Sequence, residues 1–531
     1  CLILIKNIYN MSTACQIFKN SYQSFGYDDL IIMPNSCQND ENDNMNSVID
    51  FSINDVNLRT RITTNICINT PIVSSPMDTV TSAEMAIQLA LQGGIGILHC
   101  NQTIEDQVTQ ILKVKRYYNG FINDPITFGP YSTAQDIIDA HEKYGFSEFP
   151  IIDEDRKLVG LVSRKEIDLL DNPDKINVRD IMMIDLKTAP DSSSLAECTE
   201  IIKKCKISRL LIVDSEGKLA KLVCRKDIKV LRKYPLATLH HETRQLMVGA
   251  AVSTHESDKT RIHNLIEAGV DFLVIDSSNG ATQFQINTLK YIKNISITIL
   301  EKEIDVICGN VVTGEQARIL VMAGANGIRV GMGIGSICTT QNVTGVGRGQ
   351  ASAIFDVAHT VWKMTMMNEI NENGKIIVKP WTGRIIPIIA DGGISNTGHI
   401  VKALALGADC VMLGSMLAGT DEAPGDYYYK EGVRVKKYRG MGSMEAMTQR
   451  GSKERYLSSE SSGGIVTQGV SGVVTGKGGV DKYVPTLAKA IKHGFQNMGC
   501  KDMIYRDVKF EIRTSASILD GNVHHLFSYE H

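Results

Sequence analysis

The sequence lacks the features that mark membrane, disulfide-rich and nucleic-acid-binding chains. No apolar run approaches the ~18 residues that a membrane helix needs. The twelve cysteines form no CxxC pair, which argues against a zinc site or a disulfide framework and favours a reducing, cytoplasmic compartment. The net charge is only −3, so no basic field attracts nucleic acid. Prolines are few, at 13, whereas 45 glycines indicate tight turns or close backbone approaches to a ligand.

Short apolar runs followed by amphipathic stretches recur through residues 30–120 and 241–440. Examples are PIVSSPMDT before SAEMAIQLALQGG, and IPIIADGGI before NTGHIVKALALGA. Strands that alternate with helices predict a parallel sheet covered on both faces. About eight such units in roughly 250 residues favour a closed (β/α)₈ TIM barrel over an open sheet. The polar residues after the runs then lie at the carboxyl ends of strands, where such barrels carry their chemistry.

An internal repeat interrupts this rhythm. FPIIDEDRKLVGLVSRKEI at 149–167 aligns without a gap to LLIVDSEGKLAKLVCRKDI at 210–228. Each copy predicts a β-hairpin with an Asp-containing turn and then the start of a helix. The alternative is chance similarity, but four polar pairs stay in register: Asp153/Asp214, Lys157/Lys218, Arg164/Arg225 and Lys165/Lys226.

These patterns divide the chain into an α/β barrel and an inserted domain. We expect an N-terminal extension at 1–24 with Met11 as a candidate start, barrel at 25–121, an insertion at 122–236 and barrel again at 237–531. Residues 443–480 are rich in Gly, Ser and Met and predict a mobile flap over the active site. Residues 293–304 and 364–384 lengthen two connections and are interpreted as disordered or peripheral insertions.

The segment GMGIGSICTTQ at 331–341 holds the strongest candidate for covalent chemistry. Its three alternating glycines allow the backbone to wrap a ligand or ion, and Ser336 can offer a hydroxyl and an N–H to a phosphate. Cys338 follows on a loop after a predicted strand, which suits an attacking thiolate. We interpret the other eleven cysteines as small buried hydrophobic residues.

Three further segments suggest a nucleotide ligand. The glycine-rich turns of ADGGI at 390–394 and MLGSM at 412–416 favour phosphate binding after the last strands, although either alone could be a plain tight turn. Asp391 beside them suits ribose hydroxyls, and DSSNG at 276–280 could hold a second ribose. No GxGxxG opens a barrel unit, so a dinucleotide would not bind in the Rossmann manner.

Many long motifs occur together and in order: SSPMDTVT, GGIG, DSSNG, GNVVT, RVGMGIGSICTT, ADGGI, ALGA, MLGSMLAG, EAPG, KKYRGMGSMEAM and QGVSG. From about residue 25 to 530 the chain resembles the IMP dehydrogenase family. The inserted repeat resembles that family's tandem CBS motifs, which bind regulatory nucleotides in some members.

The resemblance implies oxidation of IMP to XMP with NAD and water, the committed step of guanine nucleotide synthesis. Cys338 would attack C2 of hypoxanthine, and hydride would pass to NAD. Arg455, with Tyr456, would then activate water, Thr340 would position that water, and Gln468 would belong to the closed flap. Residue chemistry alone makes Arg455 an anion binder, because the pKa of arginine lies above about 12.

The resemblance also implies the binding residues. The IMP set is Ser75, Met77, Ser336, Asp391, Gly392, Gly393, Gly414, Ser415, Tyr438, Gly440, Met441, Gly442 and Gln468. The NAD set is Thr254, His255, Asp276, Ser277, Ser278, Asn310, Arg329, Gly331 and Gly333. A potassium ion would bind Gly333, Gly335 and Cys338, together with Asp520, Gly521 and Asn522 of a neighbouring subunit.

The implied partners are IMP, NAD, adenine or guanine nucleotides at the CBS motifs, and copies of the chain in a homotetramer, with an octamer left open. The chain departs from the family pattern at Asp520, Asn522 and Gly349, where Glu, Gly and Pro are common, and at the 364–384 insertion. Two alternatives remain. GMP reductase shares the barrel and the cysteine but runs an NADPH-dependent deamination, and it usually lacks the ERYL and TQGVSG flap pattern. A nucleotide-sensing scaffold without catalysis would not need Cys338, Thr340, Arg455 and Tyr456.

Overall fold

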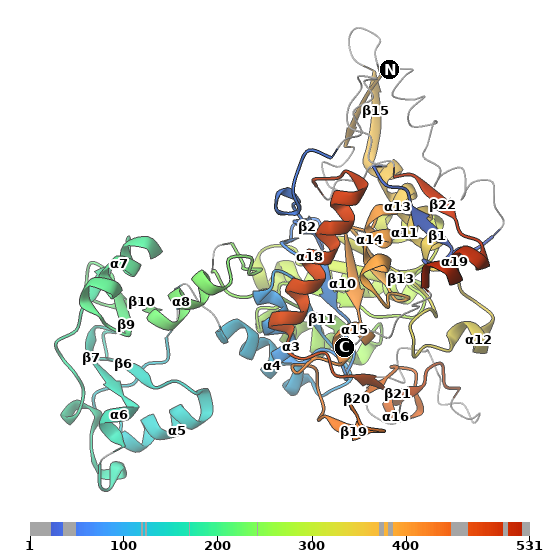
Figure 1. Cartoon of the computed structure of the whole chain (residues 1–531). Helices are drawn as coiled ribbons and strands as arrows, with labels where there is room; N and C mark the ends of the chain where they lie inside the picture. Colours follow the sequence, from blue (N-terminus) through green and yellow to red (C-terminus); the bar gives the residue numbers. More distant parts are fainter. Residues whose placement is uncertain are drawn as a thin grey trace. The chain divides into compact units, whose positions relative to one another are not determined.

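The computed structural model describes residues 23–35, 49–117, 121–122, 125–168, 170–241, 243–370, 376–380, 386–447, 466–502 and 508–522. The chain forms two compact units (Figure 1). One comprises residues 1–115, 236–238 and 247–531, and the other comprises residues 116–235 and 239–246. These bounds lie within several residues of the insertion expected at 122–236.

The larger unit is built on a closed barrel of eight parallel strands, which confirms the predicted barrel. Each strand comes from an apolar run that is buried on both faces, as a parallel strand between barrel interior and helices requires. In barrel order the strands are β11 (Val248–Val252), β12 (Phe272–Ile275), β13 (Asp305–Val311), β14 (Gly327–Val330), β17 (Ile388–Asp391), β18 (Cys410–Leu413), β4 (Ile72–Ser74) and β5 (Ile95–Leu98).

Helices follow the strands and cover the barrel. They are α3 (Ala83–Leu91), α4 (Ile104–Tyr117), α9 (Lys259–Glu267), α10 (Gln283–Leu300), α11 (Gly314–Met322), α13 (Gln350–Thr365), α14 (Thr397–Ala405), the short α15 (Ser415–Ala418) and α18 (Val480–Met498). Capping residues mark where several of them begin. Thr313, for example, caps α11 in a reciprocal capping box with Gln316. Because α18 packs against both α14 and α3, it fills the last place in the ring of helices.

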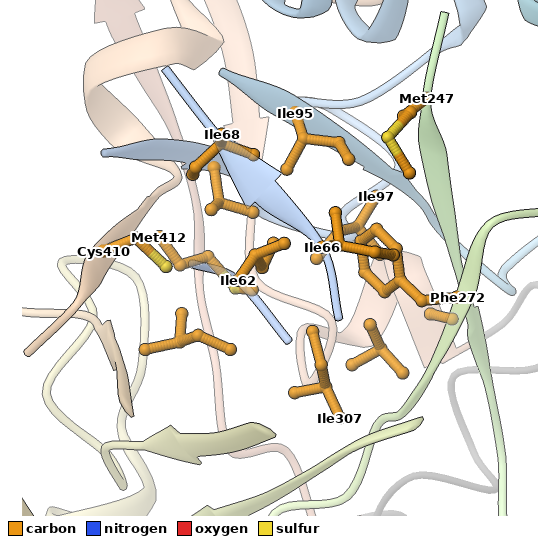
Figure 2. Packing of buried hydrophobic residues seen from close by; sticks show 14 of the residues in the cluster. Ile62, Ile66, Ile68, Ile95, Ile97, Met247, Phe272, Ile307, Cys410 and Met412 are labelled. Atoms are coloured by element: carbon orange, nitrogen blue, oxygen red, sulfur yellow. The ribbon is translucent and has the colours of Figure 1, made fainter. Parts of the chain in front are cut away.

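A short hairpin of β2 (Thr60–Arg61) and β3 (Cys67–Ile68) contributes to the hydrophobic core of the barrel (Figure 2). Ile62 and Ile68 join Phe272 from β12 in that buried cluster. A Cβ on Gly249 of β11 would lie 2.4 Å from the Phe272 ring, so glycine makes room for the aromatic side chain.

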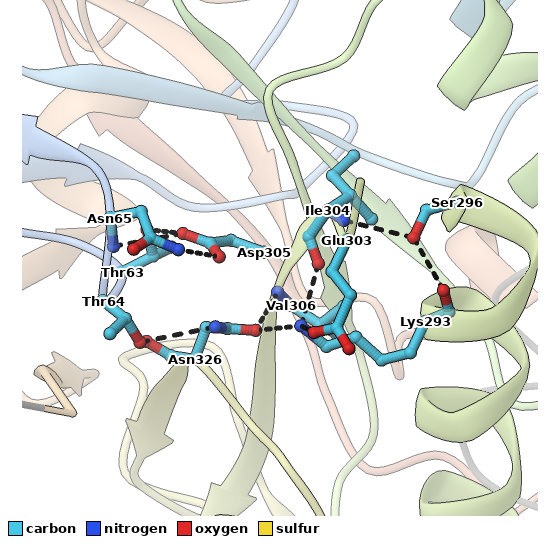
Figure 3. Close-up of polar contacts among 10 residues, drawn as sticks. All are labelled: Thr63, Thr64, Asn65, Lys293, Ser296, Glu303, Ile304, Asp305, Val306 and Asn326. Atoms are coloured by element: carbon cyan, nitrogen blue, oxygen red, sulfur yellow. Dashed lines mark hydrogen bonds and ion pairs between the residues drawn. The ribbon is translucent and has the colours of Figure 1, made fainter. Parts of the chain in front are cut away.

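Polar contacts fix the same hairpin to the amino ends of the strands (Figure 3). The Asp305 carboxylate at the start of β13 accepts hydrogen bonds from Thr63 Oγ1 at 2.6 Å and Asn65 Nδ2 at 2.8 Å. Lys293 Nζ of α10 donates to the Ile304 carbonyl at 3.0 Å and to Asn326 Oδ1 at 2.5 Å. The hairpin is therefore bonded to the amino ends of the strands, opposite the carboxyl ends at which such barrels carry their chemistry.

The prediction for residues 293–304 was wrong. Residues 293–300 continue helix α10, and the Ser296 hydroxyl accepts from the Ile304 amide. The contacts of Lys293 and Ser296 with the next strand, rather than any local signal, keep this helix long. Within the 364–384 insertion, the described residues form the antiparallel pair β15 (Met366–Ile370) and β16 (Ile376–Pro380).

The smaller unit contains the repeat. The first copy spans α5 (Ala134–Tyr144), β6 (Glu148–Ile152), β7 (Leu158–Ser163) and α6 (Arg164–Ile167). The second spans β8 (Thr188–Pro190), α7 (Leu195–Cys205), β9 (Arg209–Val213), β10 (Leu219–Cys224) and α8 (Arg225–Lys233). Two single-turn 3₁₀ helices, η2 (Pro173–Lys175) and η3 (Val178–Asp180), lie between the copies.

The two copies share their turn chemistry. Asp153 Oδ1 accepts from the amide two residues ahead at 3.0 Å and from Lys157 N at 2.8 Å. Asp214 Oδ1 accepts from the two equivalent amides at 2.9 Å, including that of Lys218. The hairpin turns also bond to each other, because Lys157 and Lys218 form an antiparallel bridge. The predicted hairpin in each copy is therefore present, and the copies pack as a pair.

The remaining elements lie in the larger unit. They are β1 (Leu30–Ile32) paired with β22 (Phe510–Ile512), the sheet β19 (Tyr428–Lys430)–β20 (Val433–Arg439)–β21 (Ser471–Thr475), the helices α12 (Thr340–Thr344), α16 (Met444–Met447) and α19 (Ser515–Asn522), and the 3₁₀ turns η1 (Ile53–Asp55) and η4 (Glu256–Asp258). Strand β21 falls inside the expected flap at 443–480, whereas residues 448–465 lie outside the described residues.

The cysteine interpretation needs correction. Cys205 is exposed and Cys67 is half-buried, so neither is a buried hydrophobic residue. Cys500 is disulfide-bonded, against the expectation of thiols throughout. Among the described residues, no helix has both the length and the apolar composition to span a membrane.

Candidate active site

A cavity of about 310 Å³ opens at the carboxyl ends of the barrel strands. Strand β13 and the loops after β4, β12, β14, β17, β18 and β20 line it, so segments more than 300 residues apart in sequence converge there. Of the residues predicted from sequence, the cavity is lined by Ser75, Met77, Ser278, Asn310, Arg329, Gly331, Gly333, Gly335, Ser336, Cys338, Thr340, Asp391, Gly392, Gly393, Gly414, Ser415, Tyr438, Gly440, Met441, Gly442 and Gln468.

Other predicted residues are not part of this lining. Thr254 and His255 follow β11, and Asp276 and Ser277 follow β12, at the same end of the barrel. Asp520, Gly521 and Asn522 form the end of α19. Arg455 and Tyr456 lie outside the described residues.

Cys338 lies on the loop at residues 331–349, called the catalytic loop here. Gly331 and Gly333 have positive φ values of 144° and 71°, so the backbone bends in ways that other residues rarely adopt. The cysteine is only half-buried, and its Sγ lies 3.2 Å from Thr340 Oγ1. The thiol is therefore accessible and has a hydroxyl beside it, as a nucleophile needs.

The described end of the expected flap pairs with the catalytic loop. Thr339 N donates to the Gln468 carbonyl at 3.0 Å, and Cys338 forms an antiparallel bridge with Gly469. Gln468 N donates in turn to the Gly442 carbonyl. The cysteine is thus flanked by Gln468 and Gly469. These residues lie far along the chain from Cys338, and no local sequence motif predicts that they meet it.

A buried arginine joins the two carboxylates that were predicted to bind riboses. Arg329 Nη1 donates to Asp276 Oδ1 at 2.6 Å, and its Nε donates to Asp391 Oδ2 at 2.9 Å. Asn310 Nδ2 donates to the same Asp391 oxygen at 2.9 Å. The arginine and Asp276 side chains are each only 2% exposed, whereas Asp391 is 17% exposed towards the cavity. The pairing fixes both carboxylates in place.

Hydrogen-bond donors suited to a phosphate also line the cavity. Gly392 and Gly393 have φ values of 93° and 71°, and Gly414 precedes the amino end of α15. Tyr438 is buried beside Ser336, and burial raises the pKa of Tyr438 far above its usual range, so the phenol stays a neutral donor. A Cβ on Gly414 would lie 2.7 Å from the Tyr438 hydroxyl, which explains the glycine.

Some residues of the site were missed by sequence reasoning. Gln350 Nε2 donates to the Asp391 carbonyl at 3.1 Å and so holds the end of β17. Arg439 pairs with Asp78 at 2.7 Å and anchors the turn at 440–442. Met332, Ile334, Ile337, Ile394, Ser395 and Met412 also line the cavity. For this last group, the only sequence feature that could have indicated a place in the site was its position, since each residue lies within two residues of a predicted site residue.

The fold and this cavity define a (β/α)₈-barrel protein with an accessible cysteine at the carboxyl ends of its strands. A family model described as the IMP dehydrogenase / GMP reductase domain matches residues 24–524. Two curated relatives are named inosine-5'-monophosphate dehydrogenase. The one from Toxoplasma gondii is 40% identical, with 97% of this chain and 98% of the relative covered. The one from Schizosaccharomyces pombe is 43% identical, with 91% and 90% covered.

Two solved structures from the same family are also similar to this chain. GMP reductase from Trypanosoma brucei in complex with guanosine 5'-monophosphate has a TM-score of 0.80 and 33% identity, covering 96% of this chain and 99% of that one. The same enzyme with guanosine 5'-triphosphate has a TM-score of 0.70 and 30% identity, covering 94% and 99%. This chain belongs to the IMP dehydrogenase / GMP reductase family.

Proposed function

We propose that this protein is an IMP dehydrogenase, which oxidises IMP to XMP with NAD and water. The observation that carries the proposal is the accessible Cys338 thiol in one cavity with Asp391 and the glycine turns. The curated relatives named as IMP dehydrogenases, at 40–43% identity over most of the chain, favour this activity.

In the proposed reaction, the Cys338 thiolate adds to C2 of hypoxanthine, and C2 loses a hydride. Ser336, Gly393, Gly414, Ser415 and Tyr438 hold the 5'-phosphate, and Asp391 binds the ribose hydroxyls. The result is a thioester-like bond between the sulfur and C2. Water then adds to C2 and loses its proton, and the thiolate leaves as XMP forms. Arg455 and Tyr456 activate that water and Thr340 positions it; the Sγ–Oγ1 distance of 3.2 Å supports the role of Thr340.

The residues near Asp276 fit a nicotinamide cofactor. NAD supplies the hydride acceptor when it is bound. Asn310 Oδ1 is buried and has no hydrogen-bond partner among the described residues, so it is ready to accept from an amide such as a carboxamide. Ser278, Gly331 and Gly333 line the cavity. Thr254 and His255 follow β11 at the same end of the barrel and are proposed to bind the adenosine end of the cofactor.

The proposed potassium site uses the carbonyls of Gly333, Gly335 and Cys338, with Asp520, Gly521 and Asn522 from a neighbouring subunit. The Gly335 carbonyl accepts one hydrogen bond, from Cys338 N, and keeps a lone pair for a hard cation. The site requires an oligomer, and we propose a homotetramer. Replacing potassium by lithium should slow turnover, and sedimentation should report four chains.

The smaller unit is proposed to be a tandem CBS domain that binds adenine or guanine nucleotides. It contains a cavity of about 650 Å³ with Arg116, Arg209, Arg225 and Lys229 in its lining, beside apolar walls that include Phe146. Cations next to an apolar wall suit phosphates next to a base. Calorimetric titration with ATP and GTP tests this, and no heat with either nucleotide would contradict it.

We also propose a cytoplasmic location. Eight of the described cysteines are thiols rather than disulfide-bonded, as a reducing compartment predicts, and Cys500 is the exception. A fluorescent fusion of the full chain would test the location.

The decisive assay for the activity follows absorbance of NADH with purified protein, IMP, NAD and potassium. NADH is expected with the native chain and none with Cys338→Ala. GMP reductase is the second candidate, because the solved relatives carry that name. Consumption of NADPH with GMP, and no NADH from IMP, would reverse the assignment. A scaffold without catalysis would show neither reaction and no effect of the cysteine substitution.

A further inference from the structure

Residues 24–29 form an irregular strap that lies against the far end of the catalytic loop. Ser24 Oγ accepts a hydrogen bond from Gly349 N at 2.6 Å, and Phe25 N donates to Ser352 Oγ at 2.8 Å. A Cβ on Gly349 would lie 2.5 Å from the Phe25 carbonyl oxygen, so the two backbones approach as closely as glycine allows. The strap therefore fixes where the catalytic loop ends.

The same strap also lies behind the turn that carries Gly393. His399 of α14 joins them, because its Nε2 lies 2.9 Å from Asp28 Oδ1 and its Nδ1 lies 3.1 Å from the Gly393 carbonyl oxygen. The Tyr27 ring stacks on the His399 ring, with centroids 5.3 Å apart. Buried Lys402 donates to the Tyr27 carbonyl at 2.8 Å and holds the strap in place.

Tyr27 fills the space behind the turn. Its ring carbons lie 3.5 and 3.8 Å from the position that a Cβ on Gly393 would take. The ring is 3% exposed, and its hydroxyl lies beside Gln350 and Asp391 without a hydrogen-bond partner among the described residues. The ring packs against both the Gly393 turn and the His399 ring, so its role at this place is to support the turn.

We propose that the strap sets the position of the phosphate-binding turn, with Tyr27 as a positioning residue for the 5'-phosphate of the substrate. This inference rests on the proposed function, since it assumes that Gly393 binds the phosphate of IMP. The Gly393 turn has positive φ values and no side chain of its own, so it takes its position from what packs behind it. The strap supplies that packing through Tyr27 and His399.

The test compares four variants of the full chain by calorimetric titration with IMP and with inosine, which lacks the phosphate. Tyr27→Leu removes the ring and should weaken IMP binding by about tenfold while inosine binding changes by less than about twofold. Tyr27→Phe keeps the ring and should bind IMP within about twofold of the native chain. Asp28→Ala removes the exposed carboxylate that faces His399, so a loss of about three- to fivefold is expected. Tyr483→Leu, at a half-buried tyrosine of α18, is the matched control and should leave both affinities unchanged.

Steady-state rates add a second readout. Tyr27→Leu should raise the KM for IMP by a similar factor, whereas kcat at saturating IMP and the KM for NAD should stay within about twofold, because a ground-state phosphate contact is weakened.

Three outcomes would overturn the inference. Equal loss of IMP and inosine affinity would mean that the ring only supports the fold. A Tyr27→Phe variant as weak as Tyr27→Leu would mean that the ring does not position the turn. Unchanged IMP binding in Asp28→Ala would exclude the His399 link, and this exposed substitution decides the question if Tyr27→Leu does not fold. Native protein that makes no NADH from IMP would instead count against the proposed function.

Discussion

Replacing Arg329 by leucine should damage stability and both ligand affinities together. The guanidinium is the partner of Asp276 at 2.6 Å and of Asp391 at 2.9 Å. Removing one member of a buried ion pair costs about 3–5 kcal/mol, because the charges left behind remain out of water. Asp276 would bear most of this cost, since its side chain is 2% exposed. Asp391 would bear less, because it is partly exposed and keeps the bond from Asn310.

The assay is thermal unfolding of the ligand-free protein, followed by kinetics. For a large domain, 1 kcal/mol moves the midpoint by about 2–4 °C, so a fall of roughly 6–20 °C is expected for Arg329→Leu. KM should rise for both IMP and NAD, since each proposed ribose carboxylate loses its anchor. The double variant Arg329→Leu with Asp276→Asn should regain part of the midpoint, because it removes the stranded charge. Arg348→Leu, at a partly exposed pair with Asp356, is a control for which a shift below about 1 kcal/mol is expected.

The reasoning fails if Arg329→Leu melts within a degree of the native chain. It also fails if only NAD binding weakens, because the arginine would then serve one carboxylate and not both. No recovery in the double variant would show that lost packing, rather than a stranded charge, is the cause.

The barrel could be predicted because each of its strands is a local signal. An apolar run that ends in polar residues identifies a strand and its carboxyl end, and closure brings those ends together. Hence the sequence alone placed Cys338, Asp391 and Gly414 in one site, because each lies at or after the carboxyl end of a different strand. Residues 293–300 were misread because their helix depends on contacts of Lys293 and Ser296 with a neighbouring strand.

The supports of the site could not be predicted. Tyr27 and Gly393 are more than 300 residues apart, and nothing near Tyr27 resembles a binding motif. Arg329 was expected near the cofactor, but its link between two carboxylates depends on the order of β12, β14 and β17 around the barrel. Sequence patterns identify residues that meet a ligand more readily than those that hold them, because the second kind is specified only by packing.

Four further substitutions probe three separate parts of the chain. Gly349→Ala should cost about 1–3 kcal/mol of stability and lower the melting midpoint, because its Cβ would lie 2.5 Å from the Phe25 carbonyl oxygen. Asp214→Ala should cost the smaller unit about 1 kcal/mol, and so should the equivalent Asp153→Ala; unequal losses by thermal scanning would contradict the shared turn. Asp409→Asn should change how stability depends on pH. Burial raises the pKa of Asp409 to about 7, above its usual 3.8. A folded-state pKa above the unfolded value means that the carboxyl stabilises the fold most at low pH, and that this contribution is lost as pH rises through about 7. The free energy of unfolding of the native chain should therefore fall by about 1–2 kcal/mol relative to that of the asparagine variant between pH 5 and pH 8, after allowance for solvent near the carboxyl. Parallel midpoint curves for the two proteins would show that Asp409 is ionised throughout this range, and the buried-carboxyl argument would then be wrong.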